Sequence, residues 1–145
     1  MTVSESLRRT GQAEPGSNQA ANALHQATAT PPLPGDMDTL RELFDPGIVW
    51  HFPGRSVLAG DHRGTDAVLG FFGRTMELTA GTFRVEVHDV VANDEHTVGL
   101  HLATGEREGR TLEDREVMVF HLRDGKVVEA WQYLENQYTY DEFFS

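Results

Sequence analysis

The sequence predicts an α+β fold in which one curved β-sheet, antiparallel or mixed, wraps around about three helices from the first half of the chain. Two observations lead to this prediction. In the first half, apolar residues recur every three or four positions, as on the buried face of a helix, whereas from Thr82 onward they alternate with polar residues, as in strands. Helices that precede hairpin-connected strands favour this class, and a sheet curved into a cone leaves an open end that suits a small-molecule pocket.

The chain of 145 residues is long enough for a single domain with a buried core. Residues 1–16 are polar and lack any period, which predicts a flexible N-terminal arm in front of one domain over residues 17–145. Ser17 or Asn18 can cap a first helix, which the proline-rich stretch PPLPG ends.

A second helix is expected to start at a cap on Asp36, because apolar residues follow at spacings of three and four: Met37, Leu40, Leu43 and Phe44. The first strand covers residues 48–52. Thr65 or Asp66 can cap a third helix, and its inner face carries Val68, Phe72 and Met76. The stretches FRVEVHDVV, TVGLHLAT, LEDREVMVFHL and KVVEAWQYLENQY then predict four strands joined as hairpins.

Composition excludes several classes of function. Twelve basic residues against 23 acidic ones give a net charge of −11, which opposes binding to nucleic acid or to an anionic membrane. The absence of cysteine excludes disulfides, thiolate zinc sites and cysteine nucleophiles. No apolar run has the length of a signal peptide core or a membrane span, so we expect a cytoplasmic protein.

Three stretches, GDMDTLRELFDPGIVWHFPG, GDHRGTDAVLGFF and LRDGKVVEAW, resemble the NTF2-like superfamily, in particular its SnoaL-like and ketosteroid-isomerase-like branches. The resemblance extends over about residues 22–144. It implies the NTF2-like cone fold. It implies no single activity, because this cone is found in isomerases, polyketide cyclases, epoxide hydrolases, dehydratases and proteins without catalysis.

Steroid isomerases of this superfamily use an Asp base at the end of the first strand and an oxyanion hole made of a Tyr and a protonated Asp. The resemblance places Phe52 at the position of the base, Met118 at the position of the oxyanion Asp, and the Tyr position near Thr28. Phe and Met neither accept nor donate a proton, so we do not expect catalysis by those groups.

If Phe52 and Met118 face the pocket, strand alternation orients their neighbours. Trp50 then lies inside with Phe52, either as a pocket wall or as ordinary core, and His51 lies outside. On the strand of Met118, the inward positions are Asp114, Glu116 and Phe120.

Glu116 is the leading catalytic candidate, because a carboxylate among apolar side chains can perform acid–base chemistry, and Asp114 is a further candidate. The alternative is that Glu116 pairs with an arginine in a structural role. Gln132 is inward on the last strand and could orient a substrate, and Glu135 or Asn136 could follow it into the site. The predicted apolar wall consists of Trp50, Phe52, Met118, Phe120, Leu134, Leu100 and Phe72.

The opposite face of the sheet is predicted to pack against a second copy of the chain. Its expected residues are Val117, Val119, Trp131 and Tyr133, with His101 and His121 as further candidates. An apolar aromatic stripe on the outside of a monomer would otherwise need another explanation. The resemblance to SnoaL-like cyclases instead implies that His121 and Glu135 act in the site, which conflicts with the outward parity of His121.

The glycine-rich connection RSVLAGDHRG could bring Asp61, His62 and Arg63 to the pocket mouth, but the favoured interpretation is a solvated loop, and it lacks the pattern of a phosphate-binding loop. The seven histidines form neither HxH nor HExxH, so we expect no metal site and no cofactor.

Three functions fit the sequence. The first is cyclisation or isomerisation of a hydrophobic, oxygenated, polyketide-like substrate. The second is an epoxide hydrolase or a hydratase, and the third is a ligand-binding or dimerising module without catalysis. A buried Glu116 without an arginine partner would favour an enzyme.

Overall fold

The computed structural model describes residues 15–29 and 34–145. Two helices come first, α2 (Pro15–Ala29) and α3 (Pro34–Leu43), followed by β1 (Phe44–Phe52), β2 (Gly60–Arg63) and helix α4 (Thr65–Leu78). Four longer strands and a short helix complete the chain: β3 (Arg84–Ala92), β4 (His96–Arg107), β5 (Arg110–Arg123), β6 (Lys126–Leu134) and α5 (Gln137–Phe143). The α+β prediction is confirmed.

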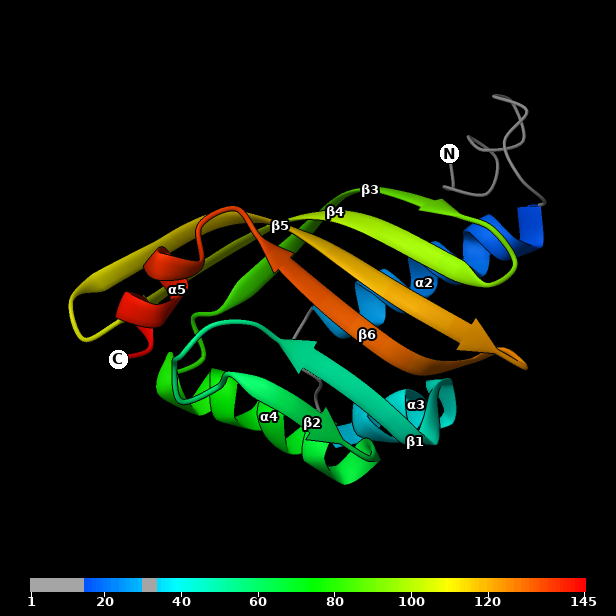
Figure 1. The fold of residues 1–145 in the computed structure, drawn as a ribbon, viewed down its shortest axis with the longest axis horizontal. Helices are drawn as coiled ribbons and strands as arrows, with labels where there is room; N and C mark the ends of the chain where they lie inside the picture. The colour runs from blue at the N-terminus through cyan, green and yellow to red at the C-terminus, as the bar shows by residue number, and fades with distance from the viewer. Residues whose placement is uncertain (1–14, 30–33) are drawn as a thin grey trace.

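The strands form one mixed sheet of six strands in the order β2-β1-β6-β5-β4-β3. All neighbours are antiparallel except β1 and β6, which run parallel. β1, the first of these strands, therefore lies beside β6, the last, although the two are far apart in the sequence. The sheet curves around the helices, with α2 behind β3 and β4 and with α4 along β1 and β2 (Figure 1).

The core fills the space between the inner face of the sheet and the helices. Its largest fully buried side chains include Trp50, Tyr140, Phe44 and Phe120. Trp50 packs edge-on against Phe72 and Phe120, with ring centroids 5.0 and 5.5 Å apart. This aromatic packing is dense and fixes the side chains at the base of the pocket described below.

Three elements differ from the sequence prediction. Phe44 was expected in the second helix, but it begins β1, where it is buried and lies opposite Val127 of β6. The strand β2 was not predicted, because its residues are largely exposed and it forms by pairing with the open edge of β1. The third element is α5, which was not predicted; only its first two residues, Gln137 and Tyr138, were read as the end of the last strand.

The predicted N-terminal arm lies outside the described residues except for Pro15 and Gly16, which begin α2. None of the helices over residues 15–29 and 34–145 is both long and apolar enough to cross a membrane.

Candidate functional site

A pocket lies between the inner face of the sheet and helices α2, α4 and α5. It contains about 610 Å³ of space not filled by atoms, its open mouth included. Most of its lining is apolar, and the aromatic and aliphatic side chains are Trp50, Phe52, Leu58, Phe71, Phe72, Met76, Phe83, Val85, Met118 and Phe144. Polar groups in this lining come from His101, Glu116, Gln132 and Tyr140, and from Thr28 and Thr75, whose hydroxyls donate to backbone oxygens of their own helices. The first four therefore determine what chemistry the pocket can support.

Glu116 is buried on β5, with 4% of its surface exposed. Its Oε2 accepts a 3.0 Å hydrogen bond from the Tyr140 hydroxyl and a 3.4 Å hydrogen bond from Gln132 Nε2. Its Oε1 lies 3.6 Å from His101 Nδ1, which is longer than a hydrogen bond. Among the described residues, no lysine or arginine pairs with Glu116, so this buried carboxylate is held by neutral donors and by an imidazole.

The amide of Gln132 is oriented by Trp50. Trp50 Nε1 donates a 2.6 Å hydrogen bond to Gln132 Oε1. Because an indole nitrogen can only donate, the amide oxygen must face Trp50 and the amide nitrogen must face Glu116. Trp50 therefore fixes Gln132 as a donor to the carboxylate.

Tyr140 reaches the pocket from α5. Asn136 caps this helix by accepting hydrogen bonds from the backbone N–H groups of Tyr138 and Thr139. Burial raises the pKa of Tyr140 well above its ordinary value, and the charge of Glu116 adds to the effect. The phenol therefore remains protonated and acts as a hydrogen-bond donor.

The glycine-rich connection after β1 anchors α5. Asp141 of α5 accepts hydrogen bonds from the backbone N–H groups of Arg55 at 2.8 Å and Ser56 at 3.2 Å. Gly54 makes this approach possible, because its φ is +104° and a Cβ at this position would lie 2.4 Å from Asp141 Oδ1. The loop thereby fixes the helix that carries Tyr140.

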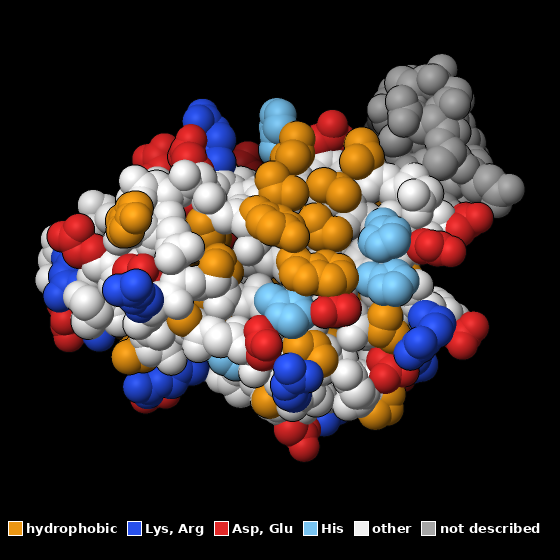
Figure 2. Space-filling model, viewed as in Figure 1, with side chains coloured by type: hydrophobic (Ala, Val, Ile, Leu, Met, Phe, Trp, Pro, Cys, Tyr) orange, Lys and Arg blue, Asp and Glu red, His pale blue; other side chains and the backbone are white. Residues whose placement is uncertain are grey.

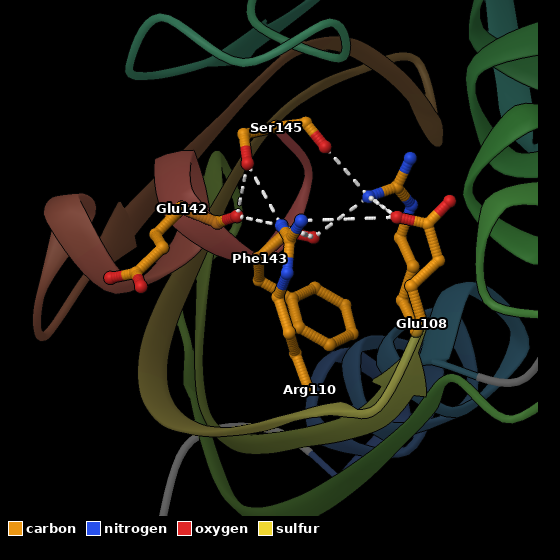
Figure 3. A network of polar contacts seen from close by, with 6 residues as sticks. Glu108, Arg110, Glu142, Phe143 and Ser145 are labelled. Atoms are coloured by element: carbon orange, nitrogen blue, oxygen red, sulfur yellow. Dashed lines mark hydrogen bonds and ion pairs between the residues drawn. The ribbon is translucent and has the colours of Figure 1, made fainter.

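Two arginines hold the other end of α5. Arg110 donates to the backbone oxygen of Glu142 and, at 2.8 Å, to the hydroxyl of Ser145. Arg107 donates at 2.8 Å to the backbone oxygen of Ser145. In Figure 3 these groups surround the last turn of the chain, so the end of the β4–β5 hairpin fixes the C-terminus.

A second set of buried polar groups extends away from Glu116. His101 of β4 lies opposite Glu116 in the β4–β5 register. Its Nε2 lies 3.0 Å from His25 Nδ1 of α2, and His25 Nε2 lies 2.7 Å from Thr97 Oγ1. Burial lowers the pKa of His25 to about 3, and the neighbouring His101 adds to the effect. His25 is therefore neutral near pH 7.

The inward orientation predicted for Trp50, Phe52, Phe72, Glu116, Met118 and Gln132 is found, and all six line the pocket. Phe120 is fully buried behind Trp50 and does not reach the pocket lining. Leu134 lies in a shallow groove with His51 and Trp131 rather than in the pocket. The prediction for Leu100 is wrong: it pairs with Val117 on the outer face and is 43% exposed.

The remaining polar candidates have other positions. Asp114 is buried and accepts a 3.1 Å hydrogen bond from the backbone N–H of Glu135, and burial raises its pKa. It does not line the pocket. Glu135 is exposed and forms a 3.7 Å ion pair with Arg115, while Asn136 caps α5. Neither Glu135 nor Asn136 therefore enters the pocket.

The two histidines proposed for the outer face lie on opposite faces of the sheet. His121 lies on that face and stacks on His96, with ring centroids 4.7 Å apart, so the pairing of His121 and Glu135 in a site is not found. His101, by contrast, points inward and lines the pocket. Its placement outside was wrong because the register of β4 against β5, which sets its face, is not visible from either strand alone.

Sequence reasoning also missed Tyr140 and His25. The spacing of Tyr140, Phe143 and Phe144, with Asn136 as a cap, is the pattern of a short amphipathic helix and could have revealed α5. His25 follows Leu24 on the buried face of α2 and gave no comparable signal.

The glycine-rich connection contributes to the pocket mainly through Leu58. His62 hydrogen-bonds to the backbone oxygen of Leu58 at 2.8 Å and stacks on Phe71. Asp61 lies 2.6 Å from His51 Nδ1 on the outer side. In the described part of the chain, no three side chains of His, Cys, Asp or Glu gather as metal ligands would.

The outer face of the sheet carries a continuous apolar patch. Hydrophobic side chains gather at its centre and histidines lie along its border (Figure 2). The register of β3 to β6 places these residues side by side: Val91, Val98, Leu100, Val117, Val119, Trp131 and Tyr133. We call this set the outer patch.

The fold has counterparts in known proteins. A family model described as the SnoaL-like domain matches residues 33–130. Bal32a, from a soil-derived mobile gene cassette, is 37% identical with a TM-score of 0.81, over 89% of this chain and 98% of its own. A protein of unknown function with a cystatin-like fold from Xanthomonas campestris is 28% identical with a TM-score of 0.76, over 86% and 98% of the two chains.

Two further relatives are more distant. A loop truncation variant of IdmH is 27% identical with a TM-score of 0.60, over 78% of this chain and 88% of its own. IdmH itself is described as a proposed polyketide cyclase from Streptomyces antibioticus. An uncharacterised protein of Mycobacterium tuberculosis is 27% identical over 112 residues, which cover 77% of this chain and 86% of that protein.

Proposed function

Because the chain belongs to the SnoaL-like family of the NTF2-like superfamily, we propose that it is an enzyme that cyclises or isomerises a hydrophobic, oxygenated small molecule of the polyketide type. Glu116 is the group that transfers the proton. Trp50, Phe52, Phe72 and Met118 form the wall against which the substrate folds.

The environment of Glu116 carries this proposal. A buried carboxylate is rare unless a cation neutralises it, and such groups are frequent at catalytic sites. Glu116 is buried in an apolar pocket, and its contacts are Tyr140, Gln132 and His101 rather than an arginine. An arginine partner would have favoured the structural alternative.

The two oxygens of Glu116 differ in a way that suits proton transfer. Oε2 accepts hydrogen bonds from Tyr140 and Gln132, which fix the orientation of the carboxylate. Oε1 accepts no hydrogen bond from these residues and is the oxygen available to a substrate. It removes a proton from a carbon beside a substrate carbonyl, and the electron pair of the broken C–H bond forms an enolate.

The enolate has two outcomes. If its carbon attacks a second carbonyl of the same molecule, a ring closes. The attacked carbonyl oxygen becomes an alkoxide and takes the proton from Glu116. If Glu116 instead returns the proton to a different carbon, the substrate is isomerised. Both products have the mass of the substrate, and a pocket that holds the chain folded favours the first.

The test is mass spectrometry of products after incubation of polyene, enone, polycyclic and epoxide compounds with wild type and with Glu116→Gln. Glu113→Gln is the matched control, because Glu113 is exposed on the same strand. We expect a product of unchanged mass from wild type and from the control, and at least a hundredfold loss of rate in Glu116→Gln.

Other results would support the alternative functions. A product that gains one water and depends on Glu116 would indicate an epoxide hydrolase or hydratase. Binding of a compound without any conversion by wild type would contradict the enzyme proposal and indicate a ligand-binding module.

We also propose a second copy of this chain as the partner that covers the outer patch. The seven side chains of the patch are hydrophobic. Two copies that meet through the patch bury these side chains on both sides, and the hydrophobic effect stabilises the pair.

A further inference from the structure

Four buried side chains form a continuous polar chain that ends at the proposed base. Thr97 Oγ1 lies 2.7 Å from His25 Nε2, and His25 Nδ1 lies 3.0 Å from His101 Nε2. His101 Nδ1 lies 3.6 Å from Glu116 Oε1. All four residues are buried, with exposed fractions between 0% and 4%. They come from α2, β4 and β5, so the tertiary fold assembles them.

The number of protons restricts how this chain can be arranged. A neutral imidazole has one N–H donor and one acceptor nitrogen. If Thr97 donates its hydroxyl proton to His25 Nε2, the His25 proton must lie on Nδ1 and is donated to His101 Nε2. The His101 proton then lies on Nδ1, which faces Glu116.

The opposite arrangement places the His25 proton on Nε2 and the His101 proton on Nε2. His101 Nδ1 would then direct a lone pair at Glu116 Oε1 over 3.6 Å. A lone pair facing a carboxylate is repulsive, so this arrangement needs an additional proton between the two groups. His101 Nδ1 is also the one buried side-chain nitrogen or oxygen without a hydrogen-bond partner among the described residues. A donor at that atom, directed at a carboxylate, is the less costly of the two arrangements.

The space around the histidine pair is shaped for this contact. A Cβ at Gly99 would lie 2.3 Å from His25 Nδ1 and 2.5 Å from His101 Nε2, the two atoms that share the hydrogen bond. Phe120 packs against the His25 ring, with centroids 4.7 Å apart. Backbone and core therefore leave room for the pair and for little else.

We propose that Thr97 donates to His25 and His25 donates to His101, a one-way pair of hydrogen bonds that leaves His101 with its Nδ1–H directed at Glu116 Oε1 across 3.6 Å. The role of these hydrogen bonds rests on the proposed function. They keep Glu116 a carboxylate, so that the reaction begins with proton removal rather than with proton donation. Thr97, His25 and His101 are positioning residues.

Other groups also act on Glu116. Tyr140 from α5 and Gln132 from β6 donate to it, and the His101 N–H is directed at it from β4. Asp114, two positions away on the same strand, is a buried acid whose charge would oppose that of Glu116. The donors on three sides offset this repulsion.

The primary test does not depend on activity. Long-range ¹H–¹⁵N NMR spectra of the ¹⁵N-labelled full chain near pH 7 distinguish the two neutral forms of each imidazole. We expect His25 and His101 both to carry their proton on Nδ1. A proton on Nε2 of either ring, or a doubly protonated His101, would overturn the proposal.

A variant provides the second measurement. In His101→Phe the N–H directed at the carboxylate is lost, so the Glu116 side-chain ¹³C resonance near pH 7 should move toward that of a carboxylic acid. His96→Phe, on the outer face, should leave that resonance unchanged, and no difference between the two variants would overturn the proposal. If the NMR results are as expected but Glu116→Gln retains full activity, the chain stands and the proposed function fails.

Discussion

The hydroxyl of Tyr140 donates a 3.0 Å hydrogen bond to Glu116, which lies 24 residues earlier in the sequence. The last helix of the chain thereby completes the environment of a carboxylate on the central part of the sheet. The loop after β1 and the β4–β5 hairpin both hold this helix, so three distant segments determine one hydrogen bond.

Replacing Tyr140 by Phe removes that donor while keeping the ring in the core. We expect the folded structure to persist with a loss of about 1 kcal/mol in the free energy of unfolding, because one buried hydrogen bond is lost. On a compound that wild type converts, we expect at least a tenfold lower kcat. Tyr138→Phe, on the exposed side of the same helix, is the control. Equal kcat in both variants would remove Tyr140 from the mechanism.

Gly99→Ala places a methyl group between His25 and His101. Because the core is close-packed, we expect it to lower the free energy of unfolding by about 1–3 kcal/mol in urea denaturation. Gly73→Ala is the control: this glycine is exposed in α4 with open space around its Cβ position, and alanine there should stabilise by about 0.5–1 kcal/mol. A neutral Gly99→Ala would mean that the histidine pair is loosely held.

The low pKa of His25 makes stability depend on pH. Below pH 6.5 the unfolded chain protonates this histidine, whereas the folded chain, with a pKa of about 3, does not. The free energy of unfolding therefore falls as the pH falls from about 6.5 toward 3. At pH 5 the protonation of this histidine in the unfolded chain has lowered it by about 2 kcal/mol. Urea denaturation at pH 7.5 and 5 should show a smaller acid loss in His25→Asn than in wild type. His88→Asn, at an exposed position, should match wild type, and a His25→Asn curve parallel to it would contradict this prediction.

Removing Arg110 should loosen α5, because its guanidinium holds backbone and hydroxyl oxygens of the last residues. Hydrogen exchange of the α5 amides in Arg110→Ala should be about fivefold faster or more, which corresponds to the loss of about 1 kcal/mol. Arg123→Ala, at the exposed β5–β6 turn, should leave these amides unchanged. Unchanged exchange in both variants would show that Asp141 and core packing suffice to hold the helix.

A charge in the outer patch should separate the proposed pair of copies. In Val119→Lys we expect sedimentation at the mass of one chain, where wild type sediments at the mass of two, because burying an unpaired ammonium is costly. Val57→Lys changes an exposed valine outside the patch and should not alter the mass. A wild type that sediments as one chain would contradict the proposed partner.

Periodicity was sufficient for much of the fold. The change from helical to alternating spacing at Thr82 predicted the order of helices before strands. Once the resemblance had placed Met118 inward, the alternation along β5 predicted the buried side of that strand from Asp114 to Phe120. Such patterns are local, because helical and strand periods follow from backbone geometry. The elements that escaped, β2 and α5, are short and gain their stability from what they pack against.

The candidate site divides in the same way. Glu116, Gln132 and Trp50 could be placed together because the resemblance turned Phe52 and Met118 toward the pocket, and strand alternation then oriented their neighbours. His101 and Leu100 were assigned to the wrong faces of the sheet. The face on which each side chain lies depends on the register between β4 and β5, and a shift of one residue exchanges the two faces.

The sequence by itself determined the fold class, since it follows from spacing along the chain. Together with the family resemblance it also determined the inward carboxylate and four residues of the apolar wall, Trp50, Phe52, Phe72 and Met118. Only the tertiary structure decided which groups contact that carboxylate. Tyr140, His25 and Thr97 reach it, directly or through His101, from elements that are distant in the chain, and their hydrogen bonds require distances that no local pattern encodes. The proposed role of Glu116 in proton transfer depends on those contacts.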